Sequence, residues 1–233
     1  MKQLRILGLL MAVLFMVACS EDEEPVSGNG DVMIIAKQSG TQTLYGISIY
    51  AYTLNGFQSV TVDNGATPPM TYELQPFEGY KTSFYYETPE SEYTSIKPAA
   101  GTYTFTATFT NGETQTFINT LTDKVLVAPV ITKCEYNEVE NSLEVAWEPK
   151  LGVSKYTLNI YDGSKLVFGS PQLPYTQFSY AVNTRGSGWA VDFTPIAGKT
   201  YTVRLLSYLA EPGVGNYNMQ SVSMAESTVV WGD

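Results

Sequence analysis

Histidine is absent from this sequence of 233 residues, and cysteine occurs only twice, at Cys19 and Cys134. Without histidine, the Ser-His-Asp and Cys-His groups of nucleophilic enzymes cannot be assembled. Two cysteines also supply too few ligands for most zinc sites, and they give no disulfide framework. We therefore expect no metal and no cofactor, and we expect Cys134 to be a half-buried strand residue rather than a reactive thiol.

Charge is also scarce, because charged residues make up only 15% of the chain and the formal net charge is −10. Lysine and arginine form no cluster, so nucleic acid is not an expected partner. Carboxylates are the remaining catalytic candidates, and a glycosidase needs two of them roughly 5 to 9 Å apart. The spacing of Glu148, Asp162 and Asp192 pairs none of them. This favours a protein that is not an enzyme.

The N-terminus carries the pattern of a secretory signal peptide. Lys2 and Arg5 form a short positive segment, and an apolar run of thirteen residues, 6–18, follows it. Such a run is too short for a membrane-spanning helix, which needs about twenty residues. It has the length of the central part of a signal peptide.

The end of the apolar run, Met16-Val17-Ala18-Cys19, resembles a bacterial lipobox, although Met16 stands where leucine is usual. The resemblance implies that residues 1–18 are removed and that Cys19 then carries an acyl anchor. The expected partner of Cys19 is therefore the lipid of the outer membrane. The alternative is an ordinary signal peptide with a chance cysteine.

Five residues after Cys19 resemble the acidic export signal of surface lipoproteins from Bacteroidota-type Gram-negative bacteria: Ser20, Glu21, Asp22, Glu23 and Glu24. The resemblance implies a lipid-anchored protein of the outer membrane that faces the cell exterior. Display on the periplasmic leaflet is the alternative, and the acidic run could also be a solvated spacer. The Pro-, Gly- and Ser-rich segment 25–31 that follows is typical of a flexible tether, so we expect a tether over 19–30.

The rest of the chain alternates apolar and polar residues with a period of two, which is typical of antiparallel strands. In the segment 101–114, Tyr103 and Phe105 lie on one face and threonines on the other. Asn111-Gly112 predicts a type I′ hairpin turn with both residues at positive φ. Further strands are expected over 32–37, 45–54, 57–63, 70–74 and 80–87, and no segment has a convincing helical pattern.

A pause in the strand pattern at 125–131 predicts a boundary between two domains, 31–127 and 128–233. The second resembles a fibronectin type III domain, through Pro129, "SLEVAW" (142–147), "KYTLNIY" (155–161) and "IAGKTYTVRLL" (196–206). Tyr201 matches the tyrosine-corner residue of that family. Ile196 and Ala197 depart from the family's Leu and Pro, and the loop is one residue shorter.

The resemblance implies an all-β fold of two tandem antiparallel β-sandwiches, immunoglobulin-like or fibronectin type III-like. "AAGTYTF" (99–105) and "IAGKTYTV" (196–203) are similar to one another, which also favours two related sandwiches. This fold hosts many functions, so it predicts little about the activity of the chain.

Tyrosine is the most informative residue for binding, with 17 copies in the chain. In the strand 45–54, Ile47, Ile49 and Ala51 fit an inner face, so Tyr50 and Tyr52 point outward; Tyr85 points outward on 80–87. If the two strands are neighbours, these side chains form an exposed aromatic platform. The alternative is a covered face. Tyr217, in the loop 209–220, is a further candidate for ligand binding or an ordinary surface residue.

These patterns together predict a non-enzymatic, cell-surface lipoprotein that acts as a binding or adhesion module for a glycan or a partner protein. The chain as a whole resembles small surface lipoproteins of gut Bacteroidota, some of which accompany glycan-uptake systems. An accessory subunit of an outer-membrane glycan-uptake assembly is the first alternative. A glycan-active enzyme with two carboxylates is the second.

The anchor can be tested directly. Cys19→Ala removes the only residue that the lipobox can acylate, so we expect the variant to lose lipid labelling and to leave the membrane fraction. Cys134→Ala is the matched control and is expected to change neither property. A Cys19→Ala protein that stays in the membrane fraction would show that lipid at Cys19 is not what holds it there.

Overall fold

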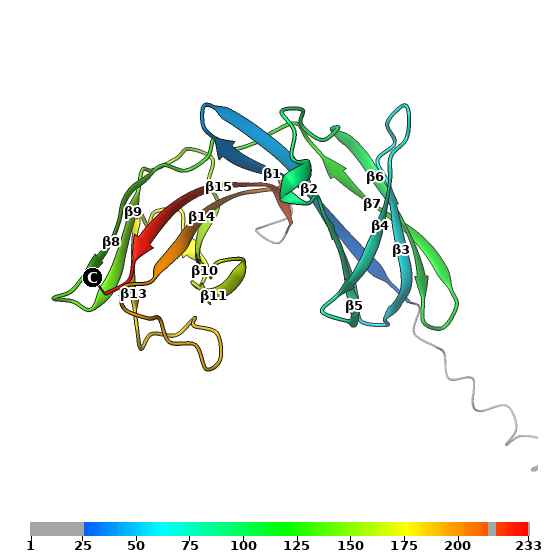
Figure 1. Ribbon diagram of the computed structural model, residues 1–233. Helices are drawn as coiled ribbons and strands as arrows, with labels where there is room; N and C mark the ends of the chain where they lie inside the picture. The colour runs from blue at the N-terminus through cyan, green and yellow to red at the C-terminus, as the bar shows by residue number, and fades with distance from the viewer. Residues whose placement is uncertain (1–25, 214–217, 233) are drawn as a thin grey trace, which may run out of the picture.

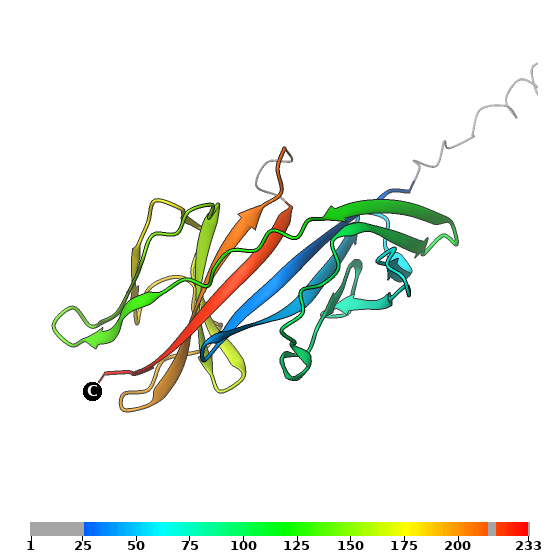
Figure 2. The ribbon, with the colours of Figure 1, turned by 90° about the horizontal axis from the view of Figure 1, so that it is seen from above.

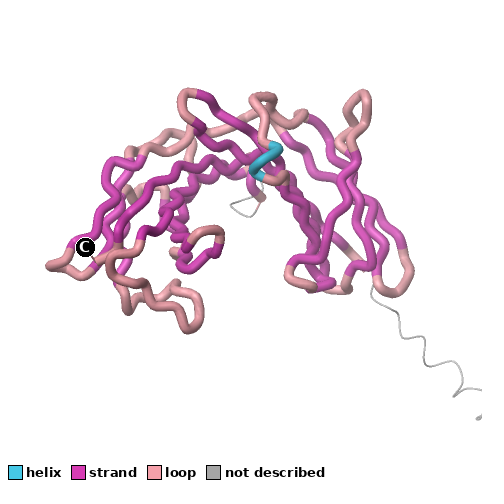
Figure 3. The backbone as a smooth tube through the Cα atoms, in the orientation of Figure 1, coloured by secondary structure: helices cyan, strands magenta, loops and turns pink. Residues whose placement is uncertain are grey.

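The computed structural model describes residues 26–213 and 218–232. Within these ranges the chain forms fifteen strands and one short 3-10 helix, so strands dominate its regular structure (Figure 3). Among the described residues, no helix has the length and hydrophobicity that crossing a membrane requires. The strands are grouped in two lobes, which together have the shape of an arch (Figure 1).

The first lobe is a sandwich with β1, β2 and β5 in one layer and β3, β6 and β7 in the other. Its fourth strand belongs to both layers, because Leu74 pairs with Val60 of β3 and Gln75 pairs with Tyr85 of β5. Apolar side chains fill the space between the layers. The elements are β1 (Gly28–Ser39), β2 (Gln42–Thr53), β3 (Phe57–Asp63), β4 (Thr71–Phe77), β5 (Tyr80–Glu87), the helix η1 (Glu90–Glu92), β6 (Gly101–Phe109) and β7 (Thr114–Leu121).

The predicted alternation is confirmed in β6 and in its pairing with β7. The apolar residues of β6 are completely buried, while its threonines lie on the other face. The turn between the strands differs from the prediction, because Gly112 has a φ of 89° but Asn111 keeps a negative φ. The Asn111 side chain accepts the N–H of Glu113 at 3.0 Å. That bond suits an ordinary φ at Asn111, so the type I′ prediction was wrong.

The first strand begins inside the segment that was expected to be a flexible tether. Gly28 and Gly30 are strand residues, and their missing side chains make room for aromatic rings. A Cβ on Gly30 would lie 2.5 Å from the Phe105 ring, and one on Gly28 would lie 2.7 Å from the Phe117 ring. These glycines therefore permit close packing of rings on the backbone rather than chain flexibility.

The second lobe is also a sandwich, and it has the layers that the fibronectin type III resemblance implies. One layer runs β11-β10-β14-β15, with β12 beside β10, and the other runs β13-β9-β8. The Tyr201 hydroxyl accepts the N–H of Ile196 at 3.0 Å, so Tyr201 forms the expected tyrosine corner. The strands are β8 (Ile131–Asn137), β9 (Ser142–Trp147), β10 (Lys155–Asp162), β11 (Lys165–Gly169), β12 (Leu173–Pro174), β13 (Ser179–Asn183), β14 (Thr200–Ala210) and β15 (Met219–Val230).

The all-β sandwich fold is thus confirmed, but the two lobes are joined by strand pairing as well as by the connecting chain. β1 pairs in parallel with β15, from Ile34 opposite Ser221 to Lys37 opposite Met224. This pairing joins one layer of each lobe, and β4 continues the same hydrogen-bonded sheet into the other layer of the first lobe, which gives twelve strands in all. Seen from above, β1 and β15 run side by side across the junction (Figure 2). We call the layer of this sheet that runs through both lobes, from β11 through β10, β14, β15, β1 and β2 to β5, the shared sheet.

Both faces of the junction are covered. On one face, Ile35, Val222 and Met224 form a small apolar cluster with neighbouring side chains that include Tyr93 and Tyr208. On the other face, the connection between the lobes is held to β15 by hydrogen bonds. The Gln220 side chain bonds both the N–H and the carbonyl of Thr122, at 3.1 and 2.9 Å, and the Ser223 hydroxyl donates to the Leu126 carbonyl at 2.6 Å.

A single sheet through both cores predicts that the lobes unfold together. All three tryptophans, Trp147, Trp189 and Trp231, lie in the second lobe, whereas Phe105 is buried in the first. Phe105→Ala should destabilise the first lobe by about 3 to 5 kcal/mol. We expect the denaturant midpoint measured by tryptophan fluorescence to fall with it. An unchanged tryptophan transition with an earlier far-UV circular dichroism transition would show that the lobes unfold independently.

Candidate ligand-binding site

The shared sheet has one face turned away from the two cores, and that face lines the concave side of the arch (Figure 1). In the first lobe, alternation on β2 and β5 sends Ile49, Ala51 and Phe84 into the core. The intervening residues Tyr50 and Tyr85 therefore point to the concave side. In the second lobe, the same alternation on β10 and β14 exposes a second set of side chains to that side.

Three aromatic rings of the first lobe are in contact on this face. Tyr50 and Tyr85 are paired residues of β2 and β5, and their ring centroids are 6.2 Å apart at an interplanar angle of 25°. Phe77 meets Tyr85 edge-on at 5.4 Å, because a bulge between Pro76 and Phe77 shifts the end of β4. Tyr52 shares the face and is 47% exposed, and Phe77 is 40% exposed. We call Tyr50, Tyr52, Phe77 and Tyr85 the aromatic strip.

The structure brings together two of the predicted site residues and places a third on the same face. Tyr50 and Tyr85 stack, and Tyr52 lies one alternation further along β2. Cys19, the acidic residues 20–24 and Tyr217 lie outside the described residues. The ligand-binding role of all these residues stays a prediction.

Phe77 was missed by the sequence analysis because the expected strand ended at residue 74. Buried residues alternate at Tyr72 and Leu74, but the alternation stops there, because Gln75, Pro76 and Phe77 are all exposed. Proline is tolerated at a bulge, which is where it lies here. The sequence therefore carries no alternation signal that would extend the strand to Phe77.

Polar groups border the aromatic strip. Burial raises the pKa of the Tyr50 hydroxyl, and the nearby Glu87 carboxylate and Tyr208 hydroxyl raise it further. Burial also raises the pKa of Glu87, while the Arg204 guanidinium opposes that shift. The strip is therefore an apolar surface with hydroxyl and carboxylate groups at its edge, which can accept and donate hydrogen bonds to a ligand.

Further along β1, where Lys37 lies opposite Leu44 of β2, four charged groups connect the lobes. Lys37 bonds Glu90 and Glu226 at 2.9 and 3.1 Å, and Arg204 bonds the same two carboxylates at 2.9 and 2.6 Å. They border a cavity of about 460 Å³ together with Tyr161, whose ring lies 4.8 Å from the Arg204 guanidinium carbon. The two positive and two negative charges balance. Because Lys37 and Glu90 belong to the first lobe and Arg204 and Glu226 to the second, these ion pairs clamp the lobes together.

A second hollow, of about 340 Å³, lies on the outer face of the three-stranded layer of the second lobe. Its floor is made of small side chains, including Ala146 and Ala181. Its charged groups Lys133 and Glu144 bond each other at 2.5 Å. Glu140 also lines the hollow. Since its one ammonium, that of Lys133, is already paired and its lining has few aromatic side chains, the aromatic strip is the stronger candidate for ligand binding.

A buried carboxyl lies close to the strip, at the position opposite Tyr50 on β1. Asp31 accepts the N–H of Met219 at 3.1 Å, and its second oxygen has no hydrogen-bond partner among the described residues. Burial raises its pKa from 3.8 to about 6, and the Glu211 carboxylate adds to the shift. Among the described residues, no group of three histidine, cysteine, aspartate or glutamate side chains could hold a metal ion.

Comparison with known proteins finds similarity among solved structures only. No protein-family model matches the sequence, and no curated protein sequence matches it. Among solved structures, the chain is similar to Tp47, the 47-kilodalton lipoprotein of Treponema pallidum, with 12% identity and a TM-score of 0.40 over 87% of this chain and 49% of that one. The chain thus spans about half the length of the Tp47 chain.

Two further solved structures match the chain with lower TM-scores. A segment of two fibronectin type III domains from chicken tenascin matches with 13% identity and a TM-score of 0.29, over 85% of this chain and 99% of that one. A BSP domain of a biofilm associated protein matches with 16% identity and a TM-score of 0.25, over 87% and 29%. At such scores these matches carry no argument about function, which rests on the geometry of this chain.

Asp31 makes stability depend on pH. Well below pH 3.8 the carboxyl is protonated in both the folded and the unfolded chain, so the folded state does not bear the free-energy cost of burying an ionised carboxylate. As the pH rises through the folded pKa of about 6, stability falls by up to about 3 kcal/mol. Asp31→Asn keeps an acceptor for the Met219 N–H and cannot ionise.

We therefore expect urea unfolding to show that Asp31→Asn gains stability relative to the natural protein at pH 8 but much less at pH 4. Glu73→Gln, on the exposed face of β4, is the control and should leave the pH dependence unchanged. Identical pH dependence in the natural protein and Asp31→Asn would show that Asp31 does not set it.

Proposed function

We propose that the protein is a non-enzymatic binding module, held at the cell surface by lipid on Cys19, and that its aromatic strip binds a glycan. The observation that carries the proposal is the contact of Tyr50, Tyr85 and Phe77 on the open, concave face of the shared sheet. The signal-peptide and lipobox patterns around Cys19 support the location.

The chemistry of the strip suits a sugar. The C–H face of a pyranose ring is flat and apolar, and it packs on an aromatic face, while its hydroxyls need hydrogen-bond partners at the edge of the contact. Tyrosine supplies both a ring and a hydroxyl, and Glu87 adds an acceptor beside Tyr50. The strip therefore offers one surface for the ring face and polar groups for the ring edge.

The support under the strip is rigid. Tyr50 and Tyr85 stand on adjacent antiparallel strands, and the residues between them, such as Ile49 and Phe84, are buried in the first core. Rings that are already held in place lose little conformational freedom on binding a ligand. Tyr85 is also held from the side by Phe77.

The size of the strip favours a glycan over a protein. A stable protein interface buries about 800 Å² on each partner, and its fully buried centre is more apolar than its rim. Here four aromatic side chains are bordered on β5 by Ser83 and Glu87, which share their face. A narrow track of rings with polar edges fits a sugar chain. The tests below also detect a protein partner, which would contradict the proposal.

Tyr50→Ala and Tyr85→Ala should each weaken glycan binding by about tenfold or more, since a central aromatic residue often contributes about 2 kcal/mol to a contact. Binding of the natural protein is first located on a glycan array and then measured by isothermal titration calorimetry. Circular dichroism establishes that the variants are folded.

Ile118→Ala is the matched control, because Ile118 is 66% exposed on β7, in the other layer of the same lobe. It should leave binding unchanged. The proposal is wrong if the array shows no glycan ligand, or if a ligand binds equally well to the natural protein and to both tyrosine variants. Capture of a protein through the strip, with no glycan bound, would also overturn it.

A further inference from the structure

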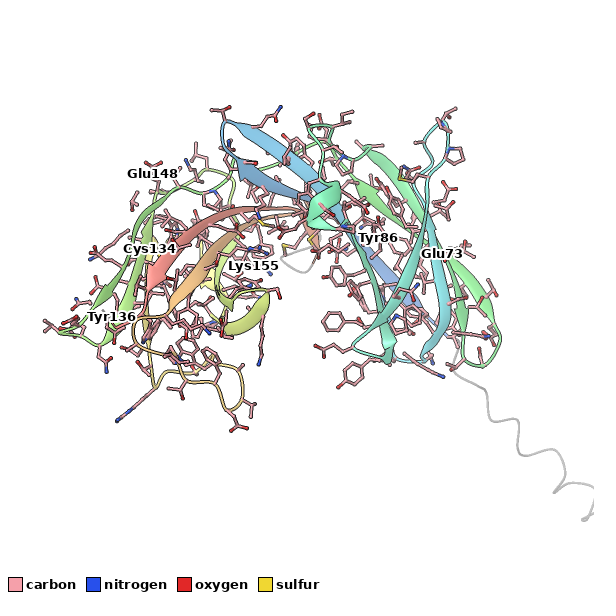
Figure 4. The ribbon with its side chains drawn as sticks, in the orientation of Figure 1. Glu73, Tyr86, Cys134, Tyr136, Glu148 and Lys155 are labelled. Carbon is pink, nitrogen blue, oxygen red and sulfur yellow. The ribbon has the colours of Figure 1, made fainter. Side chains whose placement is uncertain are left out.

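The concave face carries a second part of the site, on the opposite wall of the arch. Tyr208 of β14 lies near enough to Tyr50 for its hydroxyl to raise the pKa of Tyr50. Lys155 is the residue paired with Tyr208 on β10, and its ammonium lies 5.4 Å from the centre of the Tyr208 ring. Figure 4 shows Lys155 on the side of the second lobe that faces the first lobe.

Lys155 differs from the other lysines of the structure in having a partly buried ammonium without an anionic partner. Lys37, Lys133, Lys150 and Lys199 bond carboxylates, and the other described lysines, Lys81, Lys97, Lys124 and Lys165, are exposed. Among the described residues, no carboxylate forms an ion pair with Lys155, and burial alone lowers its pKa. A desolvated ammonium that lacks a counter-charge gains free energy when an anion binds beside it.

The position of Lys155 relative to the strip is fixed by the shared sheet. From β10 to β2 the order of strands is β10-β14-β15-β1-β2, so four steps of about 4.8 Å separate the two strands. Tyr208 stands between the ends and packs on Ile35 and Val222 at the junction. A ligand several sugar units long could therefore contact the strip and Lys155 at once.

We propose that the glycan is acidic, with a carboxylate or sulfate group that pairs with Lys155 while neutral sugar rings lie on the aromatic strip. This inference rests on the proposed function of the strip and adds the charge of the ligand and its direction. Lys155 is a specific attraction for an anion on a chain whose formal net charge is −10. Such a chain would otherwise repel an acidic polymer.

The other charged groups on the concave face are consistent with one direction of binding. Glu87 lies at the Tyr50 end, where it repels an anion and accepts hydrogen bonds from neutral sugar hydroxyls. The Lys37, Arg204, Glu90 and Glu226 charges balance one another. Asp31 is buried. The acidic unit of the ligand is therefore placed at Lys155 and the neutral units at the strip.

The test uses a glycan array that contains neutral, uronate-containing and sulfated oligosaccharides, probed with the natural protein and three variants. Lys155→Met removes the ammonium and keeps an apolar side chain, Tyr50→Ala damages the strip, and Lys124→Met removes one exposed charge from the connection between the lobes. Each uronate-containing ligand is then compared with its methyl ester by calorimetry, and sulfated ligands with their desulfated forms.

We expect acidic glycans to bind, with Lys155→Met weakening them about tenfold, as for the loss of a charge-assisted contact. Lys124→Met should have no effect, and Tyr50→Ala should weaken acidic and neutral ligands alike. The methyl esters should bind the natural protein and Lys155→Met equally. Comparison of the uronate and sulfate arms identifies which anionic group the site takes.

Two results overturn the inference while leaving the proposed function in place. One is a preference for neutral glycans, lost in Tyr50→Ala but not in Lys155→Met. The other is binding of acidic glycans with equal affinity by Lys155→Met and Lys124→Met. Absence of any glycan ligand, in contrast, overturns the proposed function and this inference together.

Discussion

The parallel pairing of β1 with β15 is the contact on which the rest of the structure depends. Without this pairing, the chain would be two sandwiches joined only by a linker, with the aromatic strip on one sandwich and Lys155 on the other. Four residues of each strand make the pairing, and the apolar cluster around Ile35 and Val222 covers it on the concave side. The Lys37 and Arg204 clamp with Glu90 and Glu226 then adds charge-paired contacts across the same junction.

The helix η1 and the residue after it show how the first lobe is fastened over that junction. Glu90 reaches Arg204 on the second lobe at 2.9 Å. The Tyr93 ring packs against Gly46 of β2, where a Cβ would approach it to 2.6 Å. The backbone at Gly46 thus receives a tyrosine ring, and the segment that leaves β5 closes over the shared sheet.

Local patterns in the sequence predicted much of each lobe. The alternation in 101–109 correctly gave the buried face of β6, and the match around Tyr201 correctly gave the tyrosine corner. Alternation predicted that Tyr50 and Tyr85 point outward, and the condition that their strands are neighbours is met by the pairing of β2 with β5. What the sequence could not give is the β1–β15 pairing, since it joins residues almost two hundred positions apart and leaves no periodic signal. Tyr208 and Lys155 were missed for that reason. Gly30 was assigned to the tether because residue type alone does not distinguish a glycine that makes room for an aromatic ring from a glycine in a flexible linker.

The orientation of β1 has a mechanical consequence. This strand is the first to follow the segment that would connect the fold to an anchor, and it is hydrogen-bonded to β2 along its full length and to β15 near its end. A pull applied at Gly28 along the strand loads those hydrogen bonds in shear, all at the same time, rather than opening them one after another. Tension from a ligand held on β2 therefore passes sideways into β1 through paired backbone, and the force reaches the attachment point without crossing a loop.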